Sequence, residues 1–131
     1  MGDNMPVRQI GSEQWDSLVG SSKKPVLVEF MTRTCPICAV MAPVIDRIAE
    51  KYEGKVTVLR MDASREQALA MNYGIMGVPT FIMFCRGRPI ASMSGEVYPA
   101  LLERMADEAL QHGDGCAERQ TRMVYEISGY G

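Results

Sequence analysis

Several segments of the chain carry apolar runs or alternations that are typical of β-strands. Val26–Met31 is almost wholly apolar and rich in β-branched residues, which predicts a strand covered on both faces. Apolar and polar residues alternate along Val56–Met61, which predicts a second strand. Thr80–Cys85 and Pro89–Ser94 flank the turn sequence Arg86-Gly87-Arg88, so these two segments predict a hairpin.

Other segments repeat their apolar residues every three or four positions, which is the pattern of a half-buried helix. One such pattern runs from Pro36 to about Tyr52, with Pro43 inside it as an expected kink. Ser64–Tyr73 predicts a short helix, and Pro99–Leu110 predicts the last one. Ser12 is a candidate N-cap for a further helix near the N-terminus.

A short apolar run, Val7–Ile10, adds a first strand. The predicted order is then β-α-β-α-β-α-β-β-α. Alternating strands and helices followed by a hairpin predict an α/β fold with a mixed sheet. We expect four or five strands in this sheet and about four helices around it.

Composition narrows the class of protein. The chain has 131 residues, enough for one domain with its own core, and a formal net charge of −2. The chain has no excess of basic residues that would indicate nucleic-acid binding. No apolar run approaches the roughly 20 residues of a membrane span. The N-terminus lacks the basic and apolar regions of a signal peptide, so we expect a cytoplasmic protein. Most of the 11 methionines fall on apolar faces, which predicts core positions.

The four cysteines are too few for a disulfide scaffold, but two of them stand three residues apart. Cys35-Pro36-Ile37-Cys38 follows the buried strand directly and opens a helix. The free N–H groups and the dipole of a helix N-terminus lower the pKa of a thiol placed there. We therefore expect Cys35 to be the exposed, attacking sulfur and Cys38, one turn further, to be the resolving sulfur.

The segment from about Val7 to Leu110 resembles the thioredoxin family. The motifs that carry the resemblance are Val28-Glu29-Phe30, Cys35-Pro36-Ile37-Cys38, Ala42-Pro43, Tyr73-Gly74-Ile75, Gly77-Val78-Pro79-Thr80 and Gly95. A CxxC after a buried strand, followed later by Gly-Val-Pro-Thr and a hairpin, is a specific combination. The resemblance implies a thioredoxin-like fold and a cis Val78–Pro79 bond that faces the cysteines.

The resemblance also implies an activity, protein thiol–disulfide exchange, with the Cys35–Cys38 disulfide as the redox centre and no organic cofactor or metal. Substrate would lie along Pro36, Ile37, Val78, Pro79 and Gly95. Glu29 takes the place of the family's buried Asp, and burial would raise its pKa and suit it to general-base work. Arg33 adds a positive charge that would lower the thiol pKa further.

The sequence departs from the family pattern around the motif. Thr34 stands where thioredoxins have Trp, and Pro36-Ile37 replaces Gly-Pro. These departures leave a second hypothesis open. The protein would then be a non-enzymatic interaction module that senses redox state, binds client proteins or holds a metal. For a metal, Cys85, Cys116 or His112 would have to complete the ligands. Otherwise Cys85 fits a small buried apolar position, and His112 fits a cap on the last helix.

Function in the cell follows from the resemblance as a set of expectations. The partners would be disulfide-bearing proteins as substrates and a recycling reductase such as a thioredoxin reductase, with no nucleic acid and no membrane. We expect a monomeric cytoplasmic reductant that contributes to cell redox homeostasis and electron transport. Residues 1–110 would form the thioredoxin-like domain. Residues 111–131, with Cys116, would form a C-terminal extension, in which Arg122–Ile127 is either a short strand or part of a mobile tail.

Overall fold

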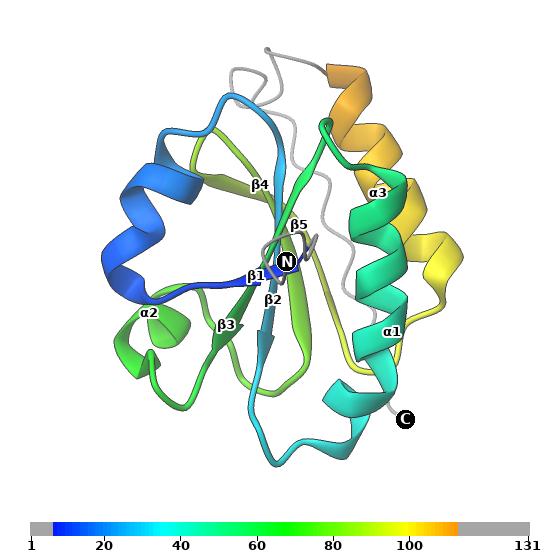
Figure 1. The fold of residues 1–131 in the computed structure, drawn as a ribbon. Coiled ribbons are helices and arrows are strands. Elements are labelled where there is room, and N and C mark those ends of the chain that lie inside the picture. The colour runs from blue at the N-terminus through cyan, green and yellow to red at the C-terminus, as the bar shows by residue number, and fades with distance from the viewer. Residues whose placement is uncertain (1–6, 113–131) are drawn as a thin grey trace, which may run out of the picture.

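A five-stranded mixed sheet forms the centre of the computed structural model, which describes residues 7–112 (Figure 1). Its strands are β1 (Val7–Gln9), β2 (Val26–Met31), β3 (Thr57–Asp62), β4 (Thr80–Cys85) and β5 (Arg88–Ser94). Their spatial order is β1-β3-β2-β4-β5. β3 runs parallel to both β1 and β2, whereas β4 is antiparallel to β2 and to β5. The predicted mixed sheet and α/β class are confirmed.

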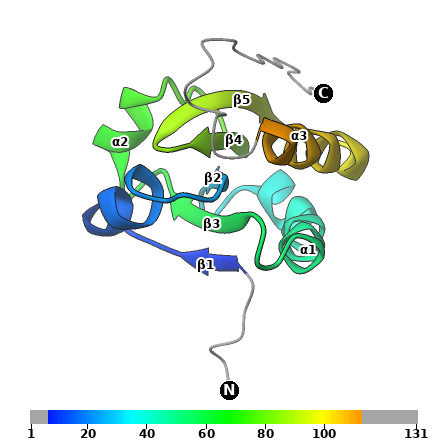
Figure 2. The same cartoon turned by 90° about the horizontal axis from the view of Figure 1, so that it is seen from above.

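Helices cover both faces of this sheet (Figure 2). The helical segments are the short turns η2 (Ser12–Gln14) and η3 (Asp16–Gly20), then α1 (Pro36–Lys51), α2 (Gln67–Asn72) and α3 (Pro99–His112). Figures 1 and 2 show α1 and α3 side by side on one face, and η3 and α2 on the other. None of the helices within residues 7–112 is long and apolar enough to cross a membrane.

Each face of the sheet has its own apolar core. Ile45 and Ile48 of α1 and Leu102 of α3 pack against one face. On the other face, Trp15 packs edge-on against Phe84 of β4, with ring centroids 5.2 Å apart. β2 lies between the two cores, which explains why its sequence is apolar almost without interruption.

The helix boundaries differ from the prediction in three places. Gly11, not Ser12, is the N-cap residue of η2: its carbonyl oxygen accepts the N–H of Gln14 at 3.1 Å, and its own N–H donates to Oε1 of Gln14 at 3.1 Å. α2 begins only at Gln67, because Asp62 accepts hydrogen bonds from the backbone and hydroxyl of Ser64 and holds the preceding residues in a turn. α3 continues to His112, so this residue ends the helix instead of following it.

The β4–β5 hairpin turns on two residues, Arg86 and Gly87, because Arg88 already belongs to β5. Their φ angles are +52° and +81°, as a two-residue hairpin turn that matches the strand twist requires. A Cβ on Gly87 would lie 3.0 Å from the Cα of Gly20. Glycine is therefore needed there for both conformation and space.

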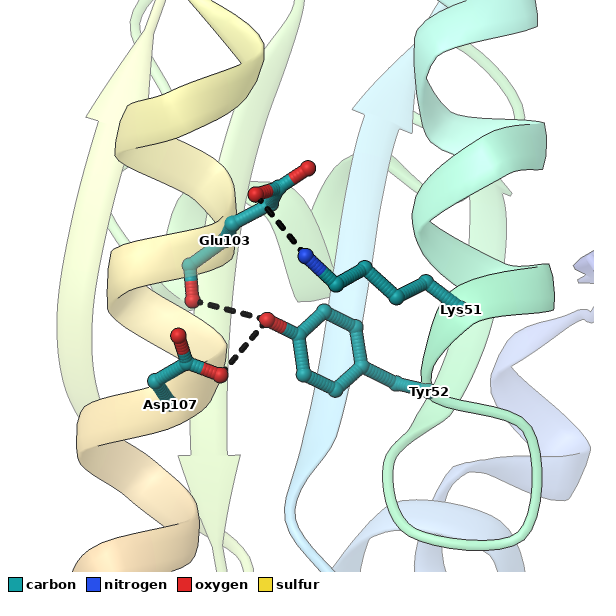
Figure 3. Close-up of polar contacts among 4 residues, drawn as sticks. All are labelled: Lys51, Tyr52, Glu103 and Asp107. Atoms are coloured by element: carbon teal, nitrogen blue, oxygen red, sulfur yellow. Dashed lines mark hydrogen bonds and ion pairs between the residues drawn. The ribbon is translucent and has the colours of Figure 1, made fainter.

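Polar side chains join the C-terminal end of α1 to α3 (Figure 3). The hydroxyl of Tyr52 donates to Oδ1 of Asp107 at 2.6 Å and also lies 3.2 Å from the carbonyl oxygen of Glu103. Beside it, Nζ of Lys51 lies 3.0 Å from Oε1 of Glu103. Burial and the neighbouring carboxylates of Asp107 and Glu103 raise the pKa of Tyr52, so its phenol stays protonated and donates at neutral pH.

Candidate active site

Cys35 and Cys38 form a disulfide at the N-terminal end of α1, with their Cα atoms 5.2 Å apart. Cys35 is the N-cap residue of the helix, and Pro36 occupies its first turn. Only a short loop separates the end of β2 at Met31 from the start of α1 at Pro36. The structure therefore brings together the pair that the sequence singled out.

The helix N-terminus interacts directly with the sulfur of Cys35. The backbone N–H of Cys38 donates to Sγ of Cys35 at 3.1 Å. The first N–H groups of a helix have no partner within the helix, and they favour a negative charge at this position. Cys35 is half-buried, whereas Cys38 is only 6% exposed, so Cys35 is the more accessible sulfur, as predicted.

The loop before β4 faces Cys35 from the other side. Sγ of Cys35 lies 3.7 Å from the carbonyl oxygen of Val78. The Val78–Pro79 peptide bond is cis, as the resemblance implied. Gly95, with φ +84°, donates its N–H to the carbonyl oxygen of Pro79 at 2.9 Å. These contacts place Val78, Pro79 and Gly95 in one connected group beside the disulfide.

The remaining predicted residues near the motif lie at the surface. Pro36 is exposed in the first turn of α1, and Ile37 beside it is 40% exposed. Arg33 is exposed in the loop two residues before Cys35. An exposed charge acts on a thiol through a screened, high-dielectric path, so its effect on the thiol pKa would be small.

Glu29 lies in the middle of β2 and is only 1% exposed, as predicted. Its Oε1 accepts a hydrogen bond from Nε of Arg60 at 2.9 Å. Burial raises the pKa of Glu29 above the ordinary value of 4.5, and the Asp46 carboxylate adds to this rise. The hydrogen bond and charge of Arg60 oppose the rise without cancelling it. The predicted direction of the shift is confirmed.

Sequence reasoning missed Arg60 as the partner of Glu29. The two residues are 31 positions apart, but they are direct partners in the parallel β2–β3 register. One signal was available: Arg60 is the only basic residue of β3, the strand that follows α1. A charged side chain on a largely buried strand needs a partner of opposite charge. The strand order needed to match it with Glu29 was not visible in the sequence.

Most of the described methionines are buried, as predicted, but two are exposed. Met71 at the end of α2 is 77% exposed, and Met76 in the loop before the cis-proline is 96% exposed. Both fall where the helical pattern stops at Gly74, so periodicity gave no sign of which way they point.

Among the described residues, no group of three or more His, Cys, Asp or Glu side chains is arranged to hold a metal ion. Cys85 is 1% exposed at the end of β4, as predicted, but it is part of a disulfide and not a free core thiol. Cys116 and the short strand or tail predicted after residue 112 lie outside the described residues. The cap predicted for His112 likewise concerns a side chain that is not described.

Comparison with known proteins identifies the family. The model of the thioredoxin family matches residues 6–108. A thioredoxin of Alicyclobacillus acidocaldarius is 38% identical over 88 residues, which is 67% of this chain and 84% of that protein. Thioredoxin 1 of a Nostoc strain is 32% identical over 102 residues, which is 78% of this chain and 95% of that protein. The chain belongs to the thioredoxin family, a family of thiol–disulfide oxidoreductases, and it carries that family's CxxC disulfide.

Plant relatives match over a similar stretch but are longer. The chloroplastic thioredoxin M5 of Oryza sativa subsp. japonica is 38% identical over 96 residues, which is 73% of this chain. The chain spans 56% of that protein, and 58% and 59% of the M-type thioredoxins of Zea mays and Pisum sativum. These relatives therefore support the family and the fold.

Proposed function

We propose that this protein is a thiol–disulfide oxidoreductase that reduces disulfides in other proteins through Cys35 and Cys38. The observation that carries the proposal is the position of Cys35 Sγ. It accepts the Cys38 N–H at a helix N-terminus and lies beside the Val78 carbonyl, in a half-exposed position. A thiolate formed there is stabilised and remains accessible to another protein.

The reaction begins with the reduced pair. The Cys35 thiolate attacks one sulfur of the substrate disulfide, so that a Cys35–substrate bond forms and the other substrate sulfur leaves as a thiolate that takes up a proton. Cys38 then loses its proton, and its thiolate attacks Cys35. This step forms the Cys35–Cys38 disulfide and releases the second substrate thiol. The substrate gains two electrons, and a recycling reductase must return two electrons to the cysteine pair.

Glu29 is our candidate for the group that takes the proton of Cys38. It is the buried carboxylate on the strand that leads to the motif, and its raised pKa brings it closer to neutral pH, where a general base is most effective. Its direct hydrogen bond goes to Arg60, so the proton would pass through a water molecule. In this scheme Arg60 positions the carboxylate and limits the rise of its pKa.

Substrate would bind beside Cys35 along the exposed Pro36 and Ile37 and against Val78, Pro79 and Gly95. The Val78 backbone supplies hydrogen-bonding groups for an extended substrate segment, in the manner of strand addition. The positive charge of Arg33 is exposed to water, so it would act only weakly on the Cys35 thiol. This arrangement is what the contacts of Val78 with Cys35 and of Gly95 with Pro79 support.

We further propose that the protein acts as a monomeric reductant in the cytoplasm, recharged by a partner such as a thioredoxin reductase. Because α3 continues to His112, we place the redox domain in residues 1–112, two residues beyond the boundary expected from the sequence, and treat 113–131 as an extension that the reaction does not need. The family match to residues 6–108 supports this boundary. A chain that ends at His112 should reduce protein disulfides at the rate of the full chain, and loss of activity would place the boundary later.

The direct test is catalysed reduction of a protein disulfide by dithiothreitol. The wild type should accelerate the reaction well above the dithiothreitol background, and Cys35→Ser should show the background rate alone. A wild type without activity, or a Cys35→Ser variant with full activity, would contradict the proposal. Absent activity with retained binding of client proteins would favour the interaction module, and zinc or iron in the purified protein would favour metal holding.

A further inference from the structure

The sulfur of Cys85, at the end of β4, belongs to a second disulfide. The sequence has four cysteines, and Cys35 and Cys38 are bonded to each other. Within one chain, the partner that remains for Cys85 is Cys116, which lies outside the described residues. We propose that a Cys85–Cys116 disulfide fastens the C-terminal extension to the end of β4, as a structural bond that the reaction at Cys35 and Cys38 does not use.

Cys85 lies at the end of the sheet opposite the reaction centre. β4 starts at Thr80, next to the cis-proline, and runs antiparallel to β2, the strand that leads to the CxxC motif. A strand advances about 3.3 Å per residue, so Cys85 stands roughly 17 Å along β4 from Thr80. The catalytic pair is fixed at the N-terminus of α1 and therefore cannot exchange with this second bond in the same molecule.

The last helix, α3, brings the chain back to the end of the sheet that carries Cys85. Asp107 of α3 accepts a hydrogen bond from Tyr52, which caps the C-terminal end of α1, far from the CxxC motif (Figure 3). α3 and Cys85 also belong to the same apolar core. The helix ends at His112, four positions before Cys116, and four extended residues span about 14 Å. The position of Cys116 in the chain thus allows its sulfur to reach Cys85.

The second bond forms by thiol–disulfide exchange with a low-molecular-weight disulfide as the oxidant. Because Cys85 is 1% exposed, we expect the oxidant to react first with Cys116. The Cys116 thiolate attacks the oxidant, so that a mixed disulfide forms and one thiol leaves. The Cys85 thiolate then attacks the Cys116 sulfur and releases the second thiol. The two cysteines lose two electrons and two protons, and the oxidant gains both.

The burial of Cys85 should protect the second bond from reduction by either route. A reductant has no access to the sulfur of Cys85, which lies within an apolar core. Attack on the other sulfur would release Cys85 as a thiolate in that core, where a charge is poorly solvated and leaves slowly. Cys35, in contrast, is half-buried and its sulfur accepts the Cys38 N–H. The two disulfides of one chain should therefore be reduced at very different rates.

The second bond should stabilise the fold without affecting the reaction. It closes a loop of about 30 residues that contains the edge strand β5 and the helix α3. Such a cross-link restricts the unfolded chain more than the folded one. Gly95, whose N–H donates to the carbonyl oxygen of Pro79, lies inside this loop at the end of β5 far from Cys85. The group beside the catalytic disulfide should thus keep its geometry when the bond is absent.

Stepwise reduction of the native, full-length wild type tests the pairing and its protection. A low concentration of dithiothreitol should produce two thiols per chain, which alkylation and peptide mapping should place at Cys35 and Cys38. The peptides of Cys85 and Cys116 should stay cross-linked until a denaturant is added, with reduction in the native state slower by about 100-fold or more. A free thiol at Cys85, a bond from Cys85 to a cysteine of another chain, or four thiols that appear at one rate would overturn the proposal.

Cys116→Ser tests what the bond does. Without reductant, its thermal midpoint should be roughly 5–15 °C below that of the wild type. The matched control compares the same two proteins after both have been fully reduced in denaturant and refolded with reductant, and there the difference should disappear. The variant should reduce a protein disulfide at the wild-type rate. An equal midpoint without reductant, a difference that persists after reduction, or a large loss of activity would overturn the proposal.

Discussion

The two ends of α1 have opposite designs. At the N-terminal end, the sulfur of Cys35 caps the helix, and Pro36 and Ile37 beside it are exposed. At the C-terminal end, Tyr52 is only 4% exposed and its hydroxyl bonds to α3 at two points. The comparison indicates that the helix is held in place at the end far from the chemistry. The reactive end can then remain accessible without loss of its position.

The two ends also use charge differently. On the strand that leads to the reactive end, the buried Glu29 carboxylate is retained although burial raises its pKa. Near the anchoring end, Lys51 and Glu103 form an ion pair that is well exposed to water. A buried charge costs stability and is useful where protons must move, whereas an exposed pair contributes little to either function or stability. Three substitutions test this division.

Glu29→Gln should have the largest effect, and it should fall on activity. Without the carboxylate, the proton of Cys38 has no base, so the rate of disulfide reduction at neutral pH should decrease by about 10²-fold. The wild-type rate should rise with pH as Glu29 loses its proton. Because its pKa is raised, this rise should occur at a higher pH than for an ordinary carboxyl group. The variant should lack this rise. A pH–rate profile of both proteins makes the test, and superimposable profiles would remove Glu29 from the mechanism.

The same pair of proteins tests the cost of burying Glu29. Its folded-state pKa is raised above 4.5, so the folded state binds the proton more tightly than the unfolded state. The stability from this group is present in full below the unfolded pKa and is lost as pH rises through the folded pKa. Wild type should therefore lose stability relative to Glu29→Gln as pH rises from about 4.5 to neutral. Urea unfolding across this range should show a difference that grows with pH, and a constant difference would contradict the raised pKa.

Tyr52→Phe should affect stability and leave catalysis intact. The substitution keeps the ring but removes the hydroxyl that joins α1 to Asp107 and Glu103. We expect a loss of about 1–2 kcal/mol in the free energy of unfolding, because one of the bonds goes to a carboxylate. Activity should stay within about twofold of wild type at temperatures where both are folded. A large loss of activity would show that the two ends of α1 are not separable.

Lys51→Met should have the smallest effect. Lys51 and Glu103 have side-chain exposures of 54% and 37%, so water and salt screen their attraction. The expected loss of stability is about 0.5 kcal/mol or less, and it should disappear at high ionic strength. A loss as large as that of Tyr52→Phe would mean that the ion pair anchors the helix as strongly as the phenol does.

The sequence predicted the parts of this protein that depend on local patterns. β2, α1 and the hairpin follow from apolar runs and periodicity, and the CxxC pair follows from its place between a strand and a helix. The N-terminal helix was predicted less well. Its polar first turn is held by the Gln14 side chain on Gly11, a contact that competes with regular helix.

Features that depend on tertiary contacts could not be predicted from the sequence. The pairing of Glu29 with Arg60 required the β2–β3 register. The exposure of Met71 and Met76 required the path of the chain after α2, which backbone hydrogen bonds around Gly74 determine. The bond from Tyr52 to Asp107 joins residues 55 positions apart, and no pattern along the chain connects them. Each of these residues looks ordinary in its own segment.

The central claim is that Cys35 attacks the substrate and Cys38 resolves the intermediate. It is tested most directly by trapping the mixed disulfide. Cys38→Ser should accumulate a covalent adduct with a protein disulfide substrate, and peptide mapping by mass spectrometry should place the adduct on Cys35. Cys35→Ser, treated in the same way, should accumulate little or no adduct. An adduct that forms equally in both variants, or one that maps to another cysteine in Cys38→Ser, would contradict the account.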